Sequence, residues 1–247
     1  MSIDNQKYFQ PHKNGFPLIP FCMNIALVGA SGRLGSEVKK VLERKHIVIS
    51  VDVAGGDFSS LDELPLLPEL IIDTSTASQS VLSGRFAYLN NIPTVIACTG
   101  HDSGQLGEIN IFAKGVPVFL AYNMAFGVQV FKEATEFIAE RFDADIHIHE
   151  THHRNKLDAP SGTAKEIENI ISHLGKPYCT TSARGGTVVG EHQVSFFGNG
   201  ETITLTHTAQ SREAFAGGIA KAAEFIVTKP AGLYNMKDLT AQQELDR

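Results

Sequence analysis

Short apolar runs alternate with segments of helical spacing through the first half of the chain. "MNIALVGA" (residues 23–30) is apolar and ends in glycine, which is typical of a buried parallel strand. Residues 32–45 have the apolar spacing of an amphipathic helix. The apolar face predicted for this helix consists of Leu34, Val38, Val41 and Leu42. Further strands are predicted at residues 46–53, 69–76, 93–100 and 116–123. This alternation predicts parallel βαβ units and hence an α/β, Rossmann-like domain over residues 23–123.

The pattern changes after about Asn123. Residues 127–142 predict an amphipathic helix, and residues 143–150 alternate apolar and polar positions as a half-exposed strand does. The apolar face predicted for that helix consists of Val130, Phe131, Ala134, Phe137 and Ile138. Residues 192–209 form two alternating runs around a Gly-Asn-Gly turn, a strong hairpin signal. These elements predict a C-terminal α+β domain with a mostly antiparallel sheet over residues 124–213. We expect the last segment, residues 214–247, to pack back on the first domain.

Composition narrows the classes of partner. The chain has 247 residues, 43% of them hydrophobic, and a net charge of −6, which gives no reason to expect nucleic acid or an anionic membrane surface. No apolar run approaches the ~18 residues that a membrane span needs. Three cysteines, at 22, 98 and 179, lack metal-ligand spacing and predict buried thiols in a reducing compartment, the cytoplasm. Residues 1–22 are predicted to be an irregular N-terminal arm.

A glycine-rich turn lies between the first predicted strand and helix. "VGASGRLG" places Gly29, Gly32 and Gly35 in a variant of the dinucleotide fingerprint. Gly29 would permit the tight turn, Gly32 would let a pyrophosphate approach the backbone, and Gly35 would let the helix pack close to the strand. Asp52 ends the next strand, where an acid that binds the ribose hydroxyls belongs. This arrangement predicts NAD(P)H binding. Asp52 slightly favours NADH, and Arg33 keeps NADPH open.

The stretch "HETHH" (residues 149–153) matches the zinc-protease pattern H-E-x-x-H. That pattern binds zinc only on a helix, where the two histidines share one face. Here an alternating, strand-like segment runs into the motif. Along a strand His149 and His153 would lie about 13 Å apart, too far to share one ion. The sequence therefore predicts no metal site, and a metallopeptidase is the weakest of the alternatives.

The residues that follow suit an anion better than a metal. His152 titrates near neutral pH, and Lys156 in the same loop is a cation. "DAPSGTAKEI" then resembles a helix start, where hydroxyls and free N–H groups bind anions. The alternative for the hydroxyls is a purely structural cap, with Ser161 or Thr163 at the N-cap and Glu166 completing a Thr-x-x-Glu box.

Together these motifs resemble one known family. "ETHHRNKLDAPSGTA" is similar to the signature E-x-H-H-x-x-K-x-D-A-P-S-G-T-A of the 4-hydroxy-tetrahydrodipicolinate reductase (dihydrodipicolinate reductase) family. "VGASGRLG", "VIACTG", "AYNMAFGV" and "RGGTVVGEHQVSFFG" resemble the family's cofactor turn, strand end, hinge and second-domain hairpin. The resemblance extends from about Met23 to Asp238. It implies an NAD(P)H-dependent oxidoreductase of diaminopimelate and lysine biosynthesis, with a small dicarboxylate substrate and a homotetrameric assembly.

The resemblance also implies residue roles. His152 would be the catalytic proton donor or acceptor, and Lys156 a second proton donor and carboxylate contact. The substrate would be bound by His153, Ser161, Gly162 and Thr163. The cofactor site would comprise Gly29, Ala30, Ser31, Gly32, Arg33, Leu34, Asp52, Ala97, Cys98, Thr99, Ala121, Tyr122, Asn123 and Met124.

The chain departs from the family pattern in its cofactor loops. Ala97-Cys98 replaces Gly-Thr, His101 replaces an aromatic residue, and Tyr122 replaces a proline. Two other functions stay open at this point. One is another two-domain dehydrogenase of an amino-acid pathway, and the other is a non-catalytic regulator that binds a dinucleotide.

Overall fold

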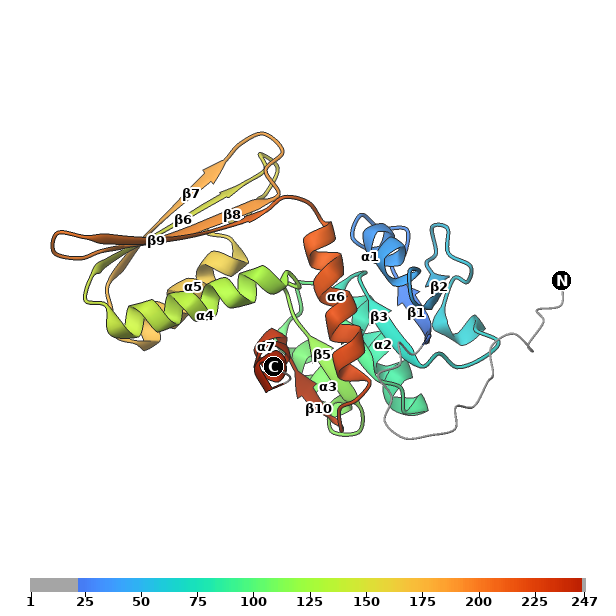
Figure 1. Cartoon of the computed structure of the whole chain (residues 1–247). Helices are drawn as coiled ribbons and strands as arrows, with labels where there is room; N and C mark the ends of the chain where they lie inside the picture. The colour runs from blue at the N-terminus through green and yellow to red at the C-terminus, as the bar shows by residue number, and fades with distance from the viewer. Residues whose placement is uncertain (1–21, 246–247) are drawn as a thin grey trace.

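The apolar runs of the first half form a six-stranded sheet, called sheet A. In the computed structural model, which describes residues 22–245, its strands lie in the order β10-β5-β4-β3-β1-β2, and all neighbouring pairs are parallel (Figure 1). The predicted arm therefore lies, except for Cys22, outside the described residues. The strands of sheet A are β1 (Asn24–Val28), β2 (Ile47–Val51), β3 (Leu70–Asp73), β4 (Thr94–Ile96), β5 (Pro117–Leu120) and β10 (Gly232–Tyr234).

Helices cover both faces of sheet A. On one face the core joins strand residues Ile25 and Leu27 to α1, α6 and α7, and the predicted apolar face of α1 lies in this core. On the other face Ala26 and Val28 belong to a second core with α2, while α3 packs beside Ile96. The helices are α1 (Gly35–Leu42), α2 (Ala77–Asn90), α3 (Ser103–Phe112), α6 (Glu213–Ile226) and α7 (Met236–Leu245), with a short 3-10 turn, η2 (Leu61–Glu63). The predicted Rossmann-like sheet is thereby confirmed.

The second half forms a separate four-stranded sheet, called sheet B. Its strand order is β7-β6-β8-β9, with β6 and β7 parallel and the other pairs antiparallel. The predicted hairpin is confirmed as β8 and β9, closed by a hydrogen bond from Gly198 N to Glu201 O at 3.0 Å. Helices α4 and α5 pack on one face of the sheet. The elements are α4 (Phe126–Arg141), β6 (Asp145–His152), α5 (Gly162–His173), β7 (Tyr178–Arg184), β8 (Gly190–Phe197) and β9 (Thr202–Ala209).

The apolar face predicted for α4 is partly wrong. Val130 and Phe137 are 46% and 59% exposed, whereas Gln129 and Thr135 are buried. The polar pair is buried without penalty because Gln129 donates to Glu133 and Thr135 donates to its own helix at Phe131 O. α4 packs against α5, α6, α7 and β9, so its buried surface is set by four neighbours rather than by one apolar stripe.

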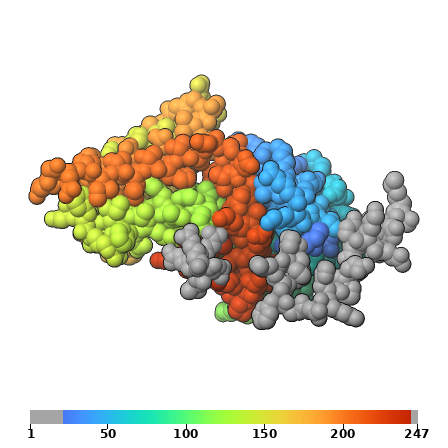
Figure 2. Space-filling view, viewed as in Figure 1, coloured from blue at the N-terminus to red at the C-terminus, as the bar shows by residue number. Residues whose placement is uncertain are grey.

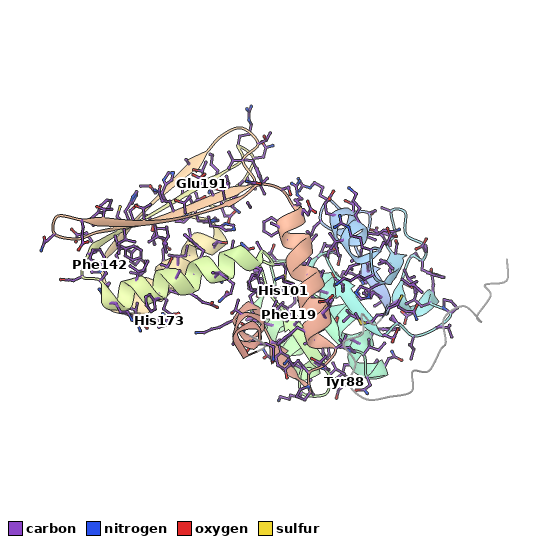
Figure 3. The ribbon with its side chains drawn as sticks, viewed as in Figure 1. Tyr88, His101, Phe119, Phe142, His173 and Glu191 are labelled. Atoms are coloured by element: carbon purple, nitrogen blue, oxygen red, sulfur yellow. The ribbon has the colours of Figure 1, made fainter. Side chains whose placement is uncertain are left out.

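The end of the chain returns to sheet A. α6 packs on α1 and on strands β4 and β5, and β10 pairs with β5 at the edge of the sheet. Figure 2 shows α6 as a column between the two lobes. Phe119 of β5 is fully buried and packs edge-on against Phe225 of α6, whereas Phe142 lies in the other lobe, at the end of α4 (Figure 3).

Two composition-based expectations are tested by the structure. No helix within residues 22–245 is long and apolar enough to cross a membrane. The prediction of buried thiols is right for Cys98 and wrong for Cys22 and Cys179, which are exposed. Cys179 is exposed because it lies on β7, an edge strand of sheet B with few buried positions.

Candidate active site

A cleft of about 1450 Å³ lies at the carboxyl ends of the sheet A strands. Ligands of doubly wound sheets bind at this edge, beside the point where strand order reverses, which here is between β1 and β3. Sheet B contributes the opposite wall through the loop between β6 and α5. The first lobe lines the cleft with Arg33, Leu34, residues 74–77, residues 97–101, Tyr122 and Asn123, and the start of α6 adds Arg212 and Phe215. The second lobe adds twelve positions from His152 to Thr187, most of them in or next to the loop, together with Val189.

The glycine-rich turn is tightly folded against the start of α1. Gly29 has φ +78° and donates its N–H to Val51 O at 3.0 Å. A Cβ on Gly35 would lie 2.1 Å from Gly29 O, so only glycine lets the helix start this close to the turn. A helix start held this way presents free N–H groups to a phosphate.

Asp52 follows β2 and holds the same turn. Its carboxylate accepts hydrogen bonds from Ser31 N at 3.0 Å, Ser31 Oγ at 2.5 Å and Ala54 N at 2.9 Å. The side-chain hydrogen bond from Ser31 lowers the pKa of Asp52, so the group is ionised at neutral pH. The carboxylate is exposed enough to meet a ribose beside the turn.

The structure brings together only part of the predicted cofactor set. Seven of those residues line the cleft, while Met124 is only 2% exposed and belongs to the sheet A core. The residues that line the cleft are Arg33, Leu34, Ala97, Cys98, Thr99, Tyr122 and Asn123. Those outside its lining are Gly29, Ala30, Ser31, Gly32, Asp52, Ala121 and Met124.

The departures from the family pattern share one wall of the cleft. Burial raises the pKa of the Cys98 thiol to about 11, so this cysteine is a neutral packing group. His101 Nε2 lies 2.7 Å from Ser80 Oγ, and its ring lies 5.9 Å from that of Tyr122. These residues add polar and aromatic surface beside the loop after β4.

His152 ends β6 and is almost buried, at 9% exposure. Its Nδ1 lies 2.5 Å from Glu150 Oε2, and a Cβ on Gly190 would lie 3.0 Å from its Nε2. Desolvation lowers the pKa of His152, and the hydrogen bond and charge of Glu150 partly offset this effect. Nδ1 is thus occupied by a carboxylate, which leaves Nε2 for proton transfer.

The other predicted substrate residues surround His152. Lys156 donates to Asp158 Oδ1 at 2.8 Å, and His153 and Gly162 also line the cleft. Thr163 Oγ1 accepts a hydrogen bond from Asn123 Nδ2 at 2.9 Å, which links α5 to the connection between the two lobes.

The helix start is capped by Ser161, not by Thr163. Ser161 Oγ accepts the hydrogen bond of Ala164 N at 3.3 Å. The Thr-x-x-Glu box is wrong, because Glu166 pairs with Lys132 of α4 at 2.7 Å instead. Ser161 lines the cleft but is only 2% exposed, and its hydroxyl also contacts His192 Nε2 at 3.1 Å, so this hydroxyl is engaged by protein groups on two sides.

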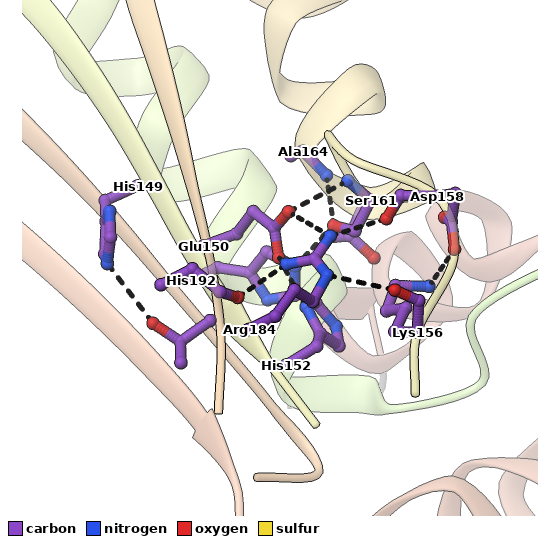
Figure 4. Close-up of polar contacts among 12 residues, drawn as sticks. His149, Glu150, His152, Lys156, Asp158, Ser161, Ala164, Arg184 and His192 are labelled. Atoms are coloured by element: carbon purple, nitrogen blue, oxygen red, sulfur yellow. Dashed lines mark hydrogen bonds and ion pairs between the residues drawn. The ribbon is translucent and has the colours of Figure 1, made fainter. Parts of the chain in front are cut away.

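The helix that a zinc protease requires does not form at residues 149–152, which belong to strand β6. His149 points away from Glu150 and His152, and its ring contacts Thr181 Oγ1 at 2.8 Å (Figure 4). Within residues 22–245 no three His, Cys, Asp or Glu side chains are grouped so as to hold a metal ion.

Three polar residues of this site, the buried Glu150 and His192 and the partly buried Arg184, are absent from the sequence-based prediction. Glu150 is fully buried and bound by Arg184, and His192 packs edge-on against His152 with ring centroids 5.2 Å apart (Figure 4). The alternation of residues 143–150 places Glu150 on the face of Ile146 and Ile148. A carboxylate on an apolar face requires a partner, and this signal could have found it.

Comparison with known proteins identifies the family. The family model described as "Dihydrodipicolinate reductase, N-terminus" matches residues 23–124, and the model described as "Dihydrodipicolinate reductase, C-terminus" matches residues 127–240. The chain belongs to the dihydrodipicolinate reductase family. The resemblance found in the motifs is thereby confirmed.

Curated dihydrodipicolinate reductase relatives match over almost their whole length. The 4-hydroxy-tetrahydrodipicolinate reductase of Brachyspira hyodysenteriae is 35% identical over 236 residues, covering 87% of this chain and 99% of the relative. That of Caldanaerobacter subterraneus is 36% identical over 251 residues, covering 88% and 98%. The structure "Dipicolinate bound Dihydrodipicolinate reductase" from Paenisporosarcina sp. TG-14 superposes with a TM-score of 0.70 at 22% identity, covering 87% of this chain and 98% of that one. At that identity the superposition supports the fold alone.

Proposed function

We propose that the chain catalyses the NAD(P)H-dependent reduction of 4-hydroxy-tetrahydrodipicolinate to tetrahydrodipicolinate in diaminopimelate and lysine biosynthesis. The observation that carries this proposal is the arrangement of the cleft. A dinucleotide-type turn borders one wall, and His152, Lys156 and the start of α5 line the other. A generic dehydrogenase of an amino-acid pathway would need the first wall but not the second.

The residues around the turn fit a nicotinamide dinucleotide. Gly35 lies close to Gly29 because it has no side chain, which leaves the N–H groups at the start of α1 free to bind a pyrophosphate. Asp52 lies beside the turn, where it could bind the hydroxyls of a ribose. When bound, the cofactor would supply the hydride. Arg33, Ala97 and Tyr122 would hold it along the sheet edge, beside the wall that carries His152.

The substrate is a ring with two carboxylates, so the cleft must neutralise negative charge. Lys156 and His153 would bind one carboxylate, and the N–H groups of Gly162 and Thr163 would bind the other. Lys156 would exchange its contact with Asp158 for the substrate. The ring hydroxyl would leave as water and the hydride would be added at the carbon that carried it. His152 would then deliver a proton from Nε2 to the adjacent ring carbon, and such acid catalysis is typically worth ~10²–10⁴-fold.

Binding of pyridine-2,6-dicarboxylate tests this proposal without turnover. We expect the planar dicarboxylate at 100 times its Kd, with NADH present, to raise Tm by roughly 5–10 °C. The variant Lys156→Met should lose most of this shift, while Lys40→Met on the exposed side of α1 should keep it. A shift with NADH alone and none with the dicarboxylate would favour the non-catalytic regulator.

Paired Michaelis constants for NADH and NADPH test the cofactor preference. The ionised Asp52 would repel the 2′-phosphate of NADPH and accept hydrogen bonds from the ribose hydroxyls of NADH. We therefore expect a KM for NADH about 10-fold below that for NADPH. Asp52→Ser should narrow this ratio. If the ratio of the two KM values were unchanged in Asp52→Ser, Asp52 would not determine the cofactor preference, and Arg33 would be the next residue to test.

The proposal also covers the domains, the assembly, the cellular location and the partners of the protein. Residues 23–123 would form the dinucleotide-binding domain and residues 124–213 the substrate-binding and oligomerisation domain. The protein would act as a cytoplasmic homotetramer, without a resident metal and without nucleic acid or membrane partners. Size-exclusion chromatography with light scattering would test the assembly.

A further inference from the structure

A fully buried carboxylate, paired with a partly buried arginine, lies beside the proposed catalytic histidine. Glu150 is 0% exposed, and its two oxygens accept hydrogen bonds from Arg184 Nη1 at 2.8 Å and Nη2 at 2.7 Å. The same oxygens also contact His152 Nδ1 at 2.5 Å and Ser161 N at 3.2 Å. One carboxylate therefore joins the end of β6, the end of β7 and the start of α5 (Figure 4).

Arg184 extends this connection to the loop that carries Lys156. Its Nε donates to Lys156 O at 3.3 Å, and one Nη donates to Asp158 O. Lys156 and Asp158 are themselves paired through their side chains. The guanidinium thus holds the loop backbone at the lysine and two residues beyond it, with the planar geometry that only arginine provides.

An ion pair with a fully buried carboxylate is a poor way to gain stability. Taking the Glu150 carboxylate wholly and the Arg184 guanidinium largely out of water costs much of what their attraction returns, and apolar replacements are often as stable. The contacts of Glu150 and Arg184 are instead directed at the groups that would touch substrate. These contacts are therefore better suited to orienting the groups that would touch substrate than to stabilising the fold.

We propose that Glu150 and Arg184 are positioning residues of the active site. Glu150 accepts a hydrogen bond from the Nδ1 proton of His152, so that Nε2, which carries the transferable proton in the imidazolium, is directed to the cleft. The ring is left as the Nδ1-protonated tautomer after that proton is given up. Arg184 holds Glu150 and fixes the loop so that Lys156 meets the substrate carboxylate. This inference rests on the proposed function, because the roles of His152 and Lys156 are part of it.

Opposite shifts in the pH profile distinguish this role from a merely structural one. The charged groups that face His152 are Glu150 on its own strand, Lys156 in the loop, Arg184 at the end of β7 and, when protonated, His192 on β8. Glu150 raises the pKa of His152 and Arg184 lowers it. An acid must be protonated, so kcat/KM falls as pH rises through that pKa. Glu150→Gln should move this fall to lower pH and Arg184→Met to higher pH.

The two variants should also affect different kinetic constants, kcat in one and the substrate KM in the other. Glu150→Gln is expected to lower kcat roughly 10- to 100-fold through loss of the histidine orientation. Arg184→Met should chiefly raise the substrate KM, by about 10-fold, because the lysine loop is released. The Kd for NADH should change by less than about twofold in both, since the turn lies in the other lobe. The control is Glu140→Gln, which breaks an exposed glutamate–arginine pair at the end of α4 and should leave all three constants unchanged.

The double variant E150Q/R184M keeps the test decisive if a single variant folds poorly. It leaves no unpaired buried charge, so it should fold, yet kcat should stay low. The opposite pH shifts of the single variants should largely cancel in the double variant, so kcat is the readout there, and a native kcat in the folded double variant would overturn the proposal.

Long-range ¹H–¹⁵N spectra of histidine-labelled protein give an answer that does not depend on turnover. The His152 signal should report an Nδ1-protonated ring in the native chain and a smaller share of that tautomer in E150Q. A native tautomer in E150Q would reject the positioning role even if the proposed reaction is correct. Conversely, a protein with the expected tautomer but no reductase activity would reject the proposed function alone.

Discussion

Replacing His152 with alanine is expected to lower kcat by ~10²–10⁴-fold, the range that general acid catalysis contributes. The imidazole is the titratable group at the end of β6 with one nitrogen held by Glu150, and its removal leaves the ring carbon without a placed proton donor. The KM for NADH should stay near the native value because His152 lies on the wall formed by the other lobe. Loss of NADH absorbance with substrate generated in situ measures both constants.

Two companion variants sharpen this experiment. Lys156→Ala should lower kcat and also raise the substrate KM, because the ammonium is proposed to bind a carboxylate as well as to donate a proton. His173→Ala is the control, since this histidine lies at the exposed end of α5 and bonds locally to Asn169 O. Near-native turnover in both His152→Ala and Lys156→Ala would remove the proposed acids.

Replacing Gly35 with alanine is expected to weaken NADH binding about 100-fold, which is about 2.7 kcal/mol. The new methyl would lie 2.1 Å from Gly29 O and 2.9 Å from Ala30 Cα, which are backbone atoms that cannot rotate away. The start of α1 would have to move off the turn, and the phosphate-binding N–H groups would move with it. The free energy of unfolding should fall by about 1–3 kcal/mol. Isothermal titration with NADH and chemical denaturation measure the two effects.

Gly107→Ala provides the matched control. Gly107 also lies in a helix, α3, but a Cβ there would meet no atom within 4 Å. Alanine at such a site favours the helix, so stability should stay the same or rise by up to about 1 kcal/mol. If Gly35→Ala bound NADH as well as Gly107→Ala does, the proposed phosphate site at α1 would be wrong.

Elements whose burial is one-sided or complete could be predicted from the sequence. The strands of sheet A are continuous apolar runs because helices cover both faces, and the β8–β9 hairpin alternates because one face is covered. The parallel order then places the turn after β1 and the loop after β4 at one sheet edge. The motifs could therefore be assigned to one cleft before any coordinates were considered.

Elements whose position depends on residues far away in the sequence could not be predicted from the sequence. β7 is a polar edge strand, "YCTTSAR", whose pairing with β6 depends on backbone hydrogen bonds that no side-chain pattern reports. Arg184 ends that strand and meets Glu150 across a separation of 34 residues. β10 has three residues, too few to show any period. The predicted apolar face of α4 is partly wrong because helices and a sheet contact this helix from several directions.

The return of the chain to sheet A has a consequence for synthesis on the ribosome. Residues 126–209 can complete sheet B and its two helices while the last part of the chain is still untranslated. Until α6 and β10 emerge, the Phe119 face of sheet A lacks its covering helix and the free side of β5 is an open edge. Such uncovered strands invite association between nascent chains. Premature termination before Glu213 would therefore release a product with a finished second lobe attached to an aggregation-prone first one.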